Sequence, residues 1–442
     1  MPLEAPLQTY SDKKAIWGWA LYDFGNSAFT TLIVTFIYSF FFAQEIVSDG
    51  NTGTAIWANG IALTAIIVTI ASPFLGALAD HGGHRRILML VSTGVAILGS
   101  ALLYFPTPGQ VMFAFVVFVV SNIAFELSGV FYNSYLPDLS KTDNIGKISG
   151  YGWSLGYLGG LLAMAIAMVG FVQTENPWFG IETGEASSFQ NIRATTLVVA
   201  VWFAVFSIPM FLWVPEPKPK QQNHLSLGKL LRGTIAQLTD TIRDIKHYTH
   251  IVRLLIARMF YNDGLITIFA LGPLYAAEVF GFTLTEVMLW GLALNVTAGL
   301  GAFAMGFLDD RVGGRKTILI SLVGLSLATL WAAIAPSEHK VSMFLAGLMV
   351  GVFVGPNQAA SRSLLGRFVP QDKETEFYGF FALSGKAMSF LGPLLYGLAI
   401  SLFGNQRLGV AIILVFFIVG GLILLGVDEE AGIASRRGVD YG

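Results

Sequence analysis

The sequence predicts an all-α membrane protein with twelve transmembrane helices in two six-helix halves. Composition is the first reason: 54% of the 442 residues are hydrophobic, 12% are charged, and the mean hydropathy is +0.66. A soluble globular chain is more polar than this. The second reason is that long apolar runs recur along the whole chain. The third is a turn rich in acidic, glycine and basic residues that occurs twice, 230 residues apart.

Each apolar run is long enough to cross the hydrocarbon core of a bilayer, which takes about 20 residues in a helix. The runs leave no room for a sizeable soluble domain. The sequence contains neither a G-x-x-x-x-G-K-[ST] loop for ATP nor an H-E-x-x-H zinc motif. We therefore expect no enzyme activity and no cofactor. The expected spans are 17–43, 57–79, 87–105, 110–134, 148–172, 194–214, 254–277, 286–308, 317–336, 342–362, 378–403 and 407–427.

The distribution of positive charge predicts the orientation. Of the 26 Lys and Arg, 22 fall on one side of the membrane or at its border, and the exceptions are Arg193, Lys340, Arg407 and Lys386. Positive residues accumulate in cytoplasmic loops, so both termini are expected in the cytoplasm. The first apolar run is too long for a cleavable signal peptide. The chain has no cysteine, which rules out disulfides and thiolate metal sites. The short loops predict a multi-pass protein of a bacterial inner (plasma) membrane.

One long internal loop divides the chain. We expect an N-terminal six-helix half over 1–214, a cytoplasmic linker over 215–250 and a C-terminal six-helix half over 251–442. The linker begins with three prolines in five residues, which ends the sixth span. Apolar residues then recur every three or four positions, as in an amphipathic helix on the cytoplasmic membrane face or under the bundle. A helix that merely joins the halves is favoured over a regulatory or partner-binding role. These apolar residues are Leu227, Leu231, Ile235, Leu238, Ile242 and Ile245.

Three repeated elements occur in the same order in both halves. Tyr22-Asp23-Phe-Gly25 corresponds to Tyr261-Asn262-Asp263-Gly264 at an offset of 239 residues. The turn after the second span is repeated at 230, and the glycine-rich start of the fifth span, 150–156, is repeated at 229. Nearly constant offsets indicate duplication of a six-span unit. Two such units related by an axis along the membrane normal form a known transporter architecture.

The repeated turn resembles the signature loop of the major facilitator superfamily. The first copy reads Gly76-Ala-Leu-Ala-Asp80-His-Gly-Gly83-His-Arg85-Arg86, and the second copy contains Asp310, Arg311 and Arg315. In that superfamily the acidic residue pairs with the loop arginines and with a helix N-terminus of the neighbouring bundle. The resemblance implies that these residues form a cytoplasmic gate, which stabilises the outward-facing state. The residues carried over are Gly76, Asp80, Gly83, Arg85, Arg86, Asp310, Arg311 and Arg315.

Other segments resemble the vacuole-effluxer-like branch of the superfamily. They are Trp17-Gly-Trp19-Ala-Leu-Tyr22-Asp23-Phe24-Gly25-Asn26-Ser27, Phe131-Tyr132-Asn133-Ser134-Tyr135-Leu136-Pro137 and Gln358-Ala-Ala-Ser361-Arg362-Ser363. A yeast member of that branch exports amino acids from the vacuole. The resemblance implies a small polar solute, with amino acids favoured over other substrates and export favoured over uptake.

Charged residues inside the spans are expensive unless paired or hydrated, so they are the best pointers to a substrate or coupling site. They are Asp23, Glu126, Asp263, Arg362 and Lys386. Asp23 could couple transport to a proton or cation, or it could pair with a basic residue across the halves. Lys386 could bind a substrate carboxylate or pair with Asp263 or Glu126. Arg362 could bind an anionic substrate or neutralise a neighbouring carboxylate. The full candidate set is Tyr22, Asp23, Asn26, Glu126, Asn133, Tyr261, Asn262, Asp263, Arg362 and Lys386.

The sequence thus predicts a secondary transporter that works by alternating access and is coupled to a proton or sodium ion. Its other partner is the lipid bilayer, the expected oligomeric state is a monomer, and no nucleic acid is involved. Two alternatives stay open. One is a sugar–cation symporter of the melibiose-permease type, which also has an acidic residue in the first span. The other is a membrane sensor or scaffold that transports nothing.

Overall fold

The computed structural model describes residues 12–216 and 227–436, and every regular element in those ranges is helical. Twelve of the helices, counted with their short extensions, are long and apolar enough to cross a membrane. This agrees with the number of spans expected from the sequence. The part of the linker at 217–226 lies outside the described residues.

The first half contains six long membrane-crossing helical segments joined by short elements. Its helices are α1 (Lys13–Ala28), η1 (Phe29–Phe36), α2 (Tyr38–Phe41), η2 (Phe42–Ile46), α3 (Gly50–Gly82), α4 (Arg85–Leu102), α5 (Val111–Ser134), α6 (Leu136–Leu139), α7 (Ile145–Ala167), η3 (Met168–Val172), η4 (Trp178–Gly180), η5 (Glu185–Ser187) and α8 (Gln190–Trp213).

The second half repeats this arrangement after one intervening helix of the linker. Its elements, beginning with the linker helix, are α9 (Leu227–Arg243), η6 (Ile245–Tyr248), α10 (Thr249–Phe280), α11 (Leu284–Val312), α12 (Gly314–Ile334), α13 (Lys340–Phe368), α14 (Glu374–Lys386), α15 (Leu391–Phe403), α16 (Gln406–Leu425) and α17 (Glu429–Arg436).

The structure corrects several of the expected limits. The first span extends from Lys13 to Ile46, through two π-helical stretches. The tenth span continues to Phe368, so Arg362 lies within a helix rather than at its end. The eleventh span is interrupted: α14 ends at Lys386 and α15 begins at Leu391. Apolar composition alone gave no sign of this break, because the intervening residues 387–390 are mostly apolar.

Each half has its own buried apolar core. Phe29, Phe42 and Phe118 are fully buried within the first half, and Leu254, Tyr261 and Leu325 within the second. The outer faces carry exposed large apolar side chains, such as Ile70 on α3, Leu212 on α8 and Ile334 on α12. In a soluble protein such faces would be a liability. On a bundle surrounded by lipid, they bury apolar surface in the hydrocarbon.

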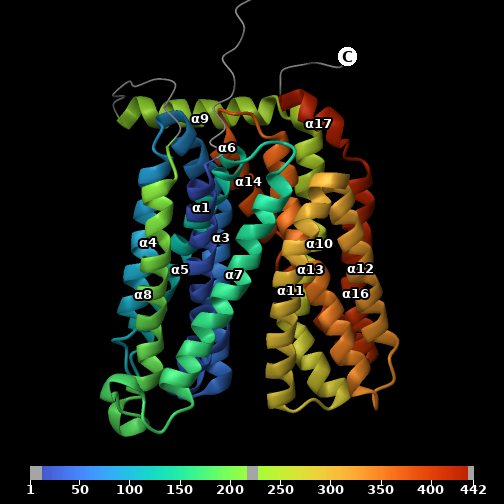
Figure 1. The fold of residues 1–442 in the computed structure, drawn as a ribbon. Helices are drawn as coiled ribbons and strands as arrows, with labels where there is room; N and C mark the ends of the chain where they lie inside the picture. Colours follow the sequence, from blue (N-terminus) through green and yellow to red (C-terminus); the bar gives the residue numbers. More distant parts are fainter. Residues whose placement is uncertain (1–11, 217–226, 437–442) are drawn as a thin grey trace, which may run out of the picture.

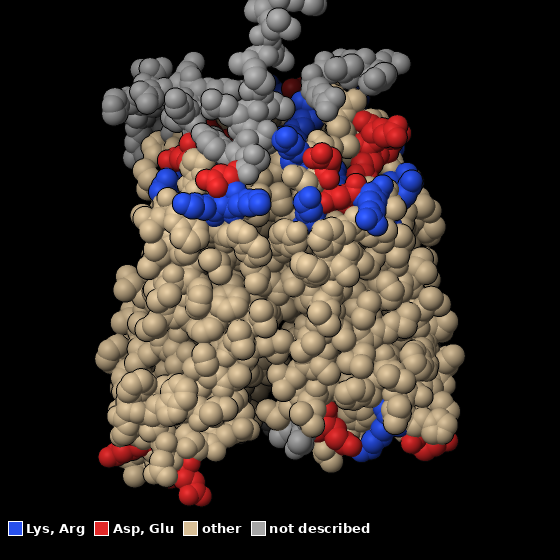
Figure 2. All heavy atoms as spheres, viewed as in Figure 1, with Lys and Arg blue, Asp and Glu red and all other residues tan. Residues whose placement is uncertain are grey.

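The two ends of the bundle differ in charge and in how closely the halves meet. Lys and Arg gather at one end, which we call the basic end, as Figure 2 shows. Helices α7 and α11 approach each other at this end and diverge toward the other (Figure 1). Between the halves, Figure 2 shows a hollow near the opposite end. The contacts that join the halves are therefore concentrated at the basic end.

Helix α9 lies across the basic end, perpendicular to the membrane-crossing helices (Figure 1). It touches both halves. Gln237 Nε2 donates to Glu376 Oε2 of α14 at 2.6 Å, and the backbone at Gly233 packs against the imidazole of His81 on α3. Thr234 and Thr241 face inward and are buried, whereas Ile235 and Ile242 are exposed. Helix α9 thus lies under the bundle, with Ile235 and Ile242 on its exposed side.

Candidate functional site

The first copy of the signature turn joins α3 to α14. The carboxylate of Asp80, at the end of α3, accepts hydrogen bonds from the backbone N–H groups of Thr375 at 3.2 Å and Glu376 at 2.8 Å. Both N–H groups belong to the first turn of α14 and have no partner within that helix. A carboxylate placed there also interacts favourably with the helix dipole. Asp80 therefore lies where the resemblance implied, at a helix N-terminus of the other half.

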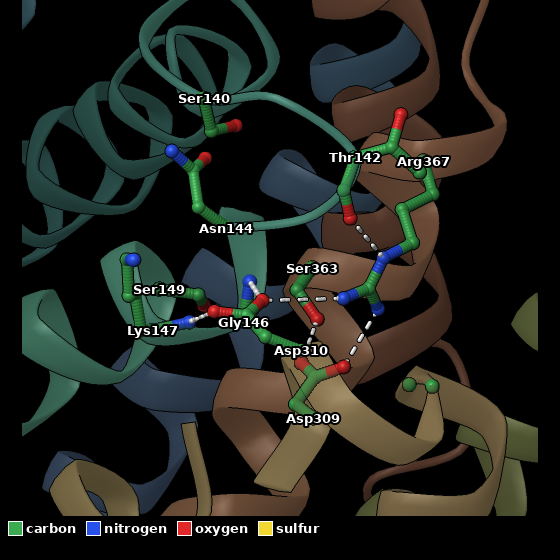
Figure 3. Close-up of polar contacts among 12 residues, drawn as sticks. Ser140, Thr142, Asn144, Gly146, Lys147, Ser149, Asp309, Asp310, Ser363 and Arg367 are labelled. Carbon is green, nitrogen blue, oxygen red and sulfur yellow. Dashed lines mark hydrogen bonds and ion pairs between the residues drawn. The ribbon is translucent and has the colours of Figure 1, made fainter. Parts of the chain in front are cut away.

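The second copy makes the same contact in the opposite direction (Figure 3). Asp310, at the end of α11, accepts hydrogen bonds from the N–H groups of Gly146 at 2.7 Å and Lys147 at 3.1 Å, in the first turn of α7. Asp80 and Asp310 are 230 residues apart, and the two pairs of N–H donors are 229 apart. The duplication of the sequence is thus a duplication of the contact. We call these contacts the first and second latch.

Glycines let the helices approach closely at both latches. A Cβ at Gly76 would lie 2.3 Å from the carbonyl oxygen of Thr375, and one at Gly379 would lie 2.4 Å from that of Ser72. In the other copy, a Cβ at Gly150 would lie 2.6 Å from Ala302 O, and one at Gly306 would lie 3.0 Å from Gly146 O. All four contacts join the two halves. Gly83 serves the turn itself, because it ends α3 in the left-handed conformation with φ of 63°.

The arginines of the turns do not bind where the resemblance implied. Arg85 pairs with Asp138 of α6 rather than with Asp80, and Arg86 donates to the carbonyl of Phe211. Both partners lie in the first half, so these arginines hold the turn against its own bundle. In the second copy, Arg315 Nη2 donates to Leu425 O at 2.7 Å, and Arg311 is exposed at the end of α11.

A buried ion-pair cluster supports the second latch, and sequence reasoning missed it (Figure 3). Arg367 of α13 lies 2.6 Å from Asp309, 3.6 Å from Asp310 and 3.5 Å from Glu429 of α17. Its Nε also donates to Thr142 O in the first half, at 3.3 Å. The repeat offset of 229 residues could have pointed to Arg367. Its equivalent in the first half is Asp138, so the two copies carry opposite charges at this position.

Beneath the latches, Arg362 of α13 extends into the first half. Its Nη1 lies 3.2 Å from Asp23 Oδ2 and 3.1 Å from Asn133 Oδ1. Its Nε and Nη2 donate to the hydroxyl and carbonyl oxygens of Ser149, at 2.9 and 2.7 Å. The guanidinium is 3% exposed. Of the alternatives left open for Asp23 and Arg362, the structure shows an ion pair across the halves.

A second ion pair crosses the halves at greater depth. Lys386 Nζ of α14 lies 2.8 Å from Glu126 Oε1 of α5. Lys386 ends a 13-residue helix that starts at the basic end, so it lies roughly 18 Å along the helix, near the middle of the bundle. The two side chains are 25% and 28% exposed, more than the others in this region. The pair therefore borders accessible space between the halves.

Asp263 lies at the break in the eleventh span. Its Oδ2 accepts a hydrogen bond at 2.8 Å from the backbone N–H of Gly392, in the first turn of α15. The side chain is 1% exposed, and within the described part of the chain Oδ1 has no hydrogen-bond partner. Neighbouring Asn262 donates to Gly385 O on α14 at 2.9 Å. These two residues of α10 hold the two ends of the interrupted helix.

The remaining candidates take up structural hydrogen bonds. The hydroxyl of Tyr22 bonds to Thr93 Oγ1 at 2.8 Å, and that of Tyr261 bonds to Ser361 Oγ at 2.7 Å. Each joins helices within one half. Asn26 is buried one turn from Asp23. Within residues 12–216 and 227–436, no group of three or more His, Cys, Asp or Glu is arranged so that it could hold a metal ion.

This fold is that of the major facilitator superfamily (MFS) transporters. The structure superposes on the proton:xylose symporter XylE with a TM-score of 0.70, covering 96% of this chain and 97% of that one at 14% identity. It superposes on FucP, in the outward conformation, with a TM-score of 0.72, covering 94% and 98% at 12% identity.

Sequence relatives specify the branch. The family described as vacuole effluxer Atg22 like matches residues 52–437, and the chain belongs to this family. An uncharacterised MFS-type transporter of Bacillus subtilis, YxiO, is 27% identical over 93% of this chain and 94% of its own length. Autophagy-related protein 22 of Kluyveromyces lactis is 25% identical over 72% of this chain and 68% of its own length. From its family and its twelve spans, the protein is a multi-pass membrane transporter and not an enzyme.

Proposed function

We propose that this protein is a secondary active transporter that moves a small polar solute by alternating access. The halves, 1–214 and 251–442, rock against each other as units, with the 215–250 linker joining them. The latches and the Asp23–Arg362 pair close the basic end in this structure. The fold is similar to that of FucP, whose structure is described as outward. This similarity supports the proposal that the basic end is closed and the opposite end is open. By the positive-inside rule the basic end faces the cytoplasm of a bacterial cell.

The observation that carries the substrate proposal is the Glu126–Lys386 pair. It is the more exposed ion pair between the halves, it lies near the middle of the bundle, and each half contributes one charge. An amino acid carries the same two charged groups, an ammonium and a carboxylate. In our proposal the ammonium binds Glu126 and the carboxylate binds Lys386, so that the solute replaces the pair and bridges the halves. The description of the family as vacuole effluxers supports export, and amino acids are the solutes that the resemblance to this branch implies.

Asp263 is the residue we propose for coupling to a proton or sodium ion. Asp23 and Glu126 pair with basic residues, whereas no Lys or Arg within the described residues lies at ion-pair distance from Asp263. A buried carboxylate without a cationic partner is costly in a medium of low dielectric constant. Binding a cation at Oδ1 would remove that cost. One copy of the chain contains all these groups, so we propose that a monomer is sufficient.

Counterflow into proteoliposomes tests the proposal. Vesicles preloaded with a neutral amino acid should accumulate the labelled amino acid, and vesicles preloaded with a sugar should not accumulate labelled sugar. Glu126→Gln should abolish accumulation, and a matched substitution on the outer face, Leu212→Ala, should not. Sugar counterflow would favour the symporter alternative. No counterflow of either solute by folded protein would contradict the substrate proposal.

A further inference from the structure

The guanidinium group of Arg362 makes four hydrogen bonds and three aromatic contacts, and every group that it contacts in this way belongs to the first half. Together these groups form a receptor for a guanidinium ion. Four hydrogen bonds come from Asp23, Asn133 and both oxygens of Ser149. Three aromatic rings surround the same group: Trp19 at 4.8 Å, Trp153 at 5.6 Å and Tyr132 at 5.7 Å from the guanidinium carbon. We call the groups of Trp19, Asp23, Tyr132, Asn133, Ser149 and Trp153 the cation socket.

The chemistry of the socket is specific for a cation that donates hydrogen bonds. Asp23 supplies a negative charge, and Asn133 and Ser149 supply neutral acceptors. The aromatic faces attract positive charge, and more strongly where water is excluded. The socket also has the shape of its occupant. A Cβ at Gly152 would lie 2.8 Å from Arg362 Nη2, 2.9 Å from Trp19 and 3.0 Å from Asp23, so only glycine leaves room for the guanidinium there.

The occupant is attached to the other half of the molecule. Arg362 belongs to α13, and it enters the first half where α13 packs against α7 at the basic end. Ser149 Oγ also donates to Ala359 O of α13 at 2.7 Å. If the basic end opens, α13 moves away from α7 and withdraws Arg362. The Asp23 carboxylate then loses the cation with which it pairs. A largely buried carboxylate that loses its cationic partner is left uncompensated, which favours uptake of another cation.

We propose that the cation socket is a binding site for a guanidinium or primary ammonium group of a small solute, and that Arg362 is its tethered occupant while the basic end is closed. Opening of the basic end exchanges Arg362 for the free cation. The site is distinct from the Glu126–Lys386 pair, which is made by other residues. The exchange rests on the proposed alternating access, whereas the binding chemistry of the socket does not.

Removing the Arg362 side chain tests whether the cation socket binds a free guanidinium ion, and this test requires no movement of the halves. Arg362→Ala leaves the socket empty in the closed state, and methylguanidinium should refill it. We expect millimolar methylguanidinium chloride to raise the melting temperature of purified full-length Arg362→Ala protein by roughly 2 °C relative to equal sodium chloride. Urea, the neutral analogue of the same shape, should give no rise. The wild-type protein, with its socket occupied, should show no rise either.

Two variants serve as controls. Arg362→Ala combined with Asp23→Asn removes the charge of the socket and should abolish the rise. Arg258→Ala deletes another buried arginine, one that contacts the Phe381 ring, Phe381 O and Ser384 Oγ but no carboxylate within the described residues. The space left by Arg258→Ala has no carboxylate to pair with a cation, so it should bind methylguanidinium much more weakly than the cation socket does. An equal rise in the Arg258→Ala protein, or none in Arg362→Ala, would overturn the proposal.

A variant that keeps Arg362 covers the case in which Arg362→Ala does not fold. Gly76→Ala disfavours the closed basic end, because the new Cβ meets Thr375 O. Methylguanidinium should raise the melting temperature of this variant, and addition of Asp23→Asn should abolish the rise. A socket that binds methylguanidinium in protein without amino acid counterflow would leave this proposal intact and contradict the substrate proposal alone.

Discussion

Single residues show how far the two copies have diverged in charge. Asp138 and Arg367 occupy equivalent positions at the 229 offset, yet they carry opposite charges. Each has found a partner of opposite sign in its own half, Arg85 in one case and Asp309 in the other. Because a buried charge must be neutralised, residues of opposite sign at equivalent positions need partners of opposite sign nearby. The latch carboxylates Asp80 and Asp310, which contact backbone rather than side chains, kept their identity.

At the residue scale, the Glu126–Lys386 pair should show strong coupling in a double-mutant cycle. Glu126→Gln or Lys386→Met alone leaves one charge without its partner in the middle of the bundle. We expect each to lower the melting temperature, and the double variant to lose less than the sum, with a coupling free energy of roughly 1–2 kcal/mol. Thermal unfolding in detergent followed by intrinsic fluorescence measures this. Additive effects would show that the two charges do not interact.

At the scale of elements, the break in the eleventh span is the feature that most shapes the middle of the second half. It ends α14 at Lys386, which pairs with the first half, and starts α15 at an N-terminus that Asp263 caps. Interrupted helices at the middle of the membrane expose backbone groups that side chains or ligands must satisfy. Here Asn262 and Asp263, adjacent on α10, satisfy one group on each side of the break.

Removing the cap should destabilise the second half. We expect Asp263→Ala to lower the stability by about 1–2 kcal/mol, the range for loss of a helix N-cap. Asp263→Asn keeps an acceptor for the N–H of Gly392 and should lower the stability by less. Thermal unfolding of the two variants measures this difference.

The same Asp263→Asn variant tests coupling. The protein should stay folded but lose the dependence of transport on the proton or sodium gradient. Gradient-driven transport retained in that variant would rule out Asp263 as the coupling residue.

At the scale of the whole molecule, close helix contacts through glycine determine which end is closed. Gly76→Ala should weaken closure of the basic end, because its Cβ would lie 2.3 Å from Thr375 O. Overpacking of this kind costs about 1–3 kcal/mol, enough to change a two-state population tenfold. Since the chain has no cysteine, spin labels can be placed at Asp143→Cys and Glu430→Cys, both exposed at the basic end in opposite halves.

Electron spin resonance distances between these labels should lengthen in a larger share of Gly76→Ala molecules than in the parent. Gly94→Ala is the matched control, because a Cβ built there meets no atom within 4 Å beyond its chain neighbours and the backbone of its own helix. It should leave the distance distribution unchanged. An unchanged distribution in Gly76→Ala would show that this contact does not control closure.

The two latches should contribute comparably to closure, since each is one carboxylate on two backbone N–H groups. Asp80→Asn and Asp310→Asn each weaken one latch by removing its charge. We expect similar shifts of the same label distances from either variant, and a larger shift from both together. A much larger effect of Asp310→Asn would instead indicate that the Arg367 cluster, and not the latch, dominates on that side.

The sequence by itself determined the class of protein, the number of spans, the duplication and the positions of the latch carboxylates. The spans and the duplication depend on hydrophobic length and repeat offset, whereas the class and the latch carboxylates follow from the resemblance of the repeated turn to a known signature, and all of these can be read along the chain. Which charged side chains form ion pairs with one another was decided only by the tertiary structure. Asp23 and Arg362 are 339 residues apart, and Glu126 and Lys386 are 260 apart, with no spacing rule to connect them.

Two further features also needed the packed helices. The break after Lys386 lies in an apolar run, and Asn262 and Asp263 of α10 form hydrogen bonds with the two helix ends beside it. Arg85 contacts Asp138 rather than Asp80 because the first turn of α14 already provides donors to the Asp80 carboxylate. A sequence lists which charges must be neutralised inside a membrane. Which groups neutralise them depends on how the helices of the two halves pack, and that is a property of the folded molecule.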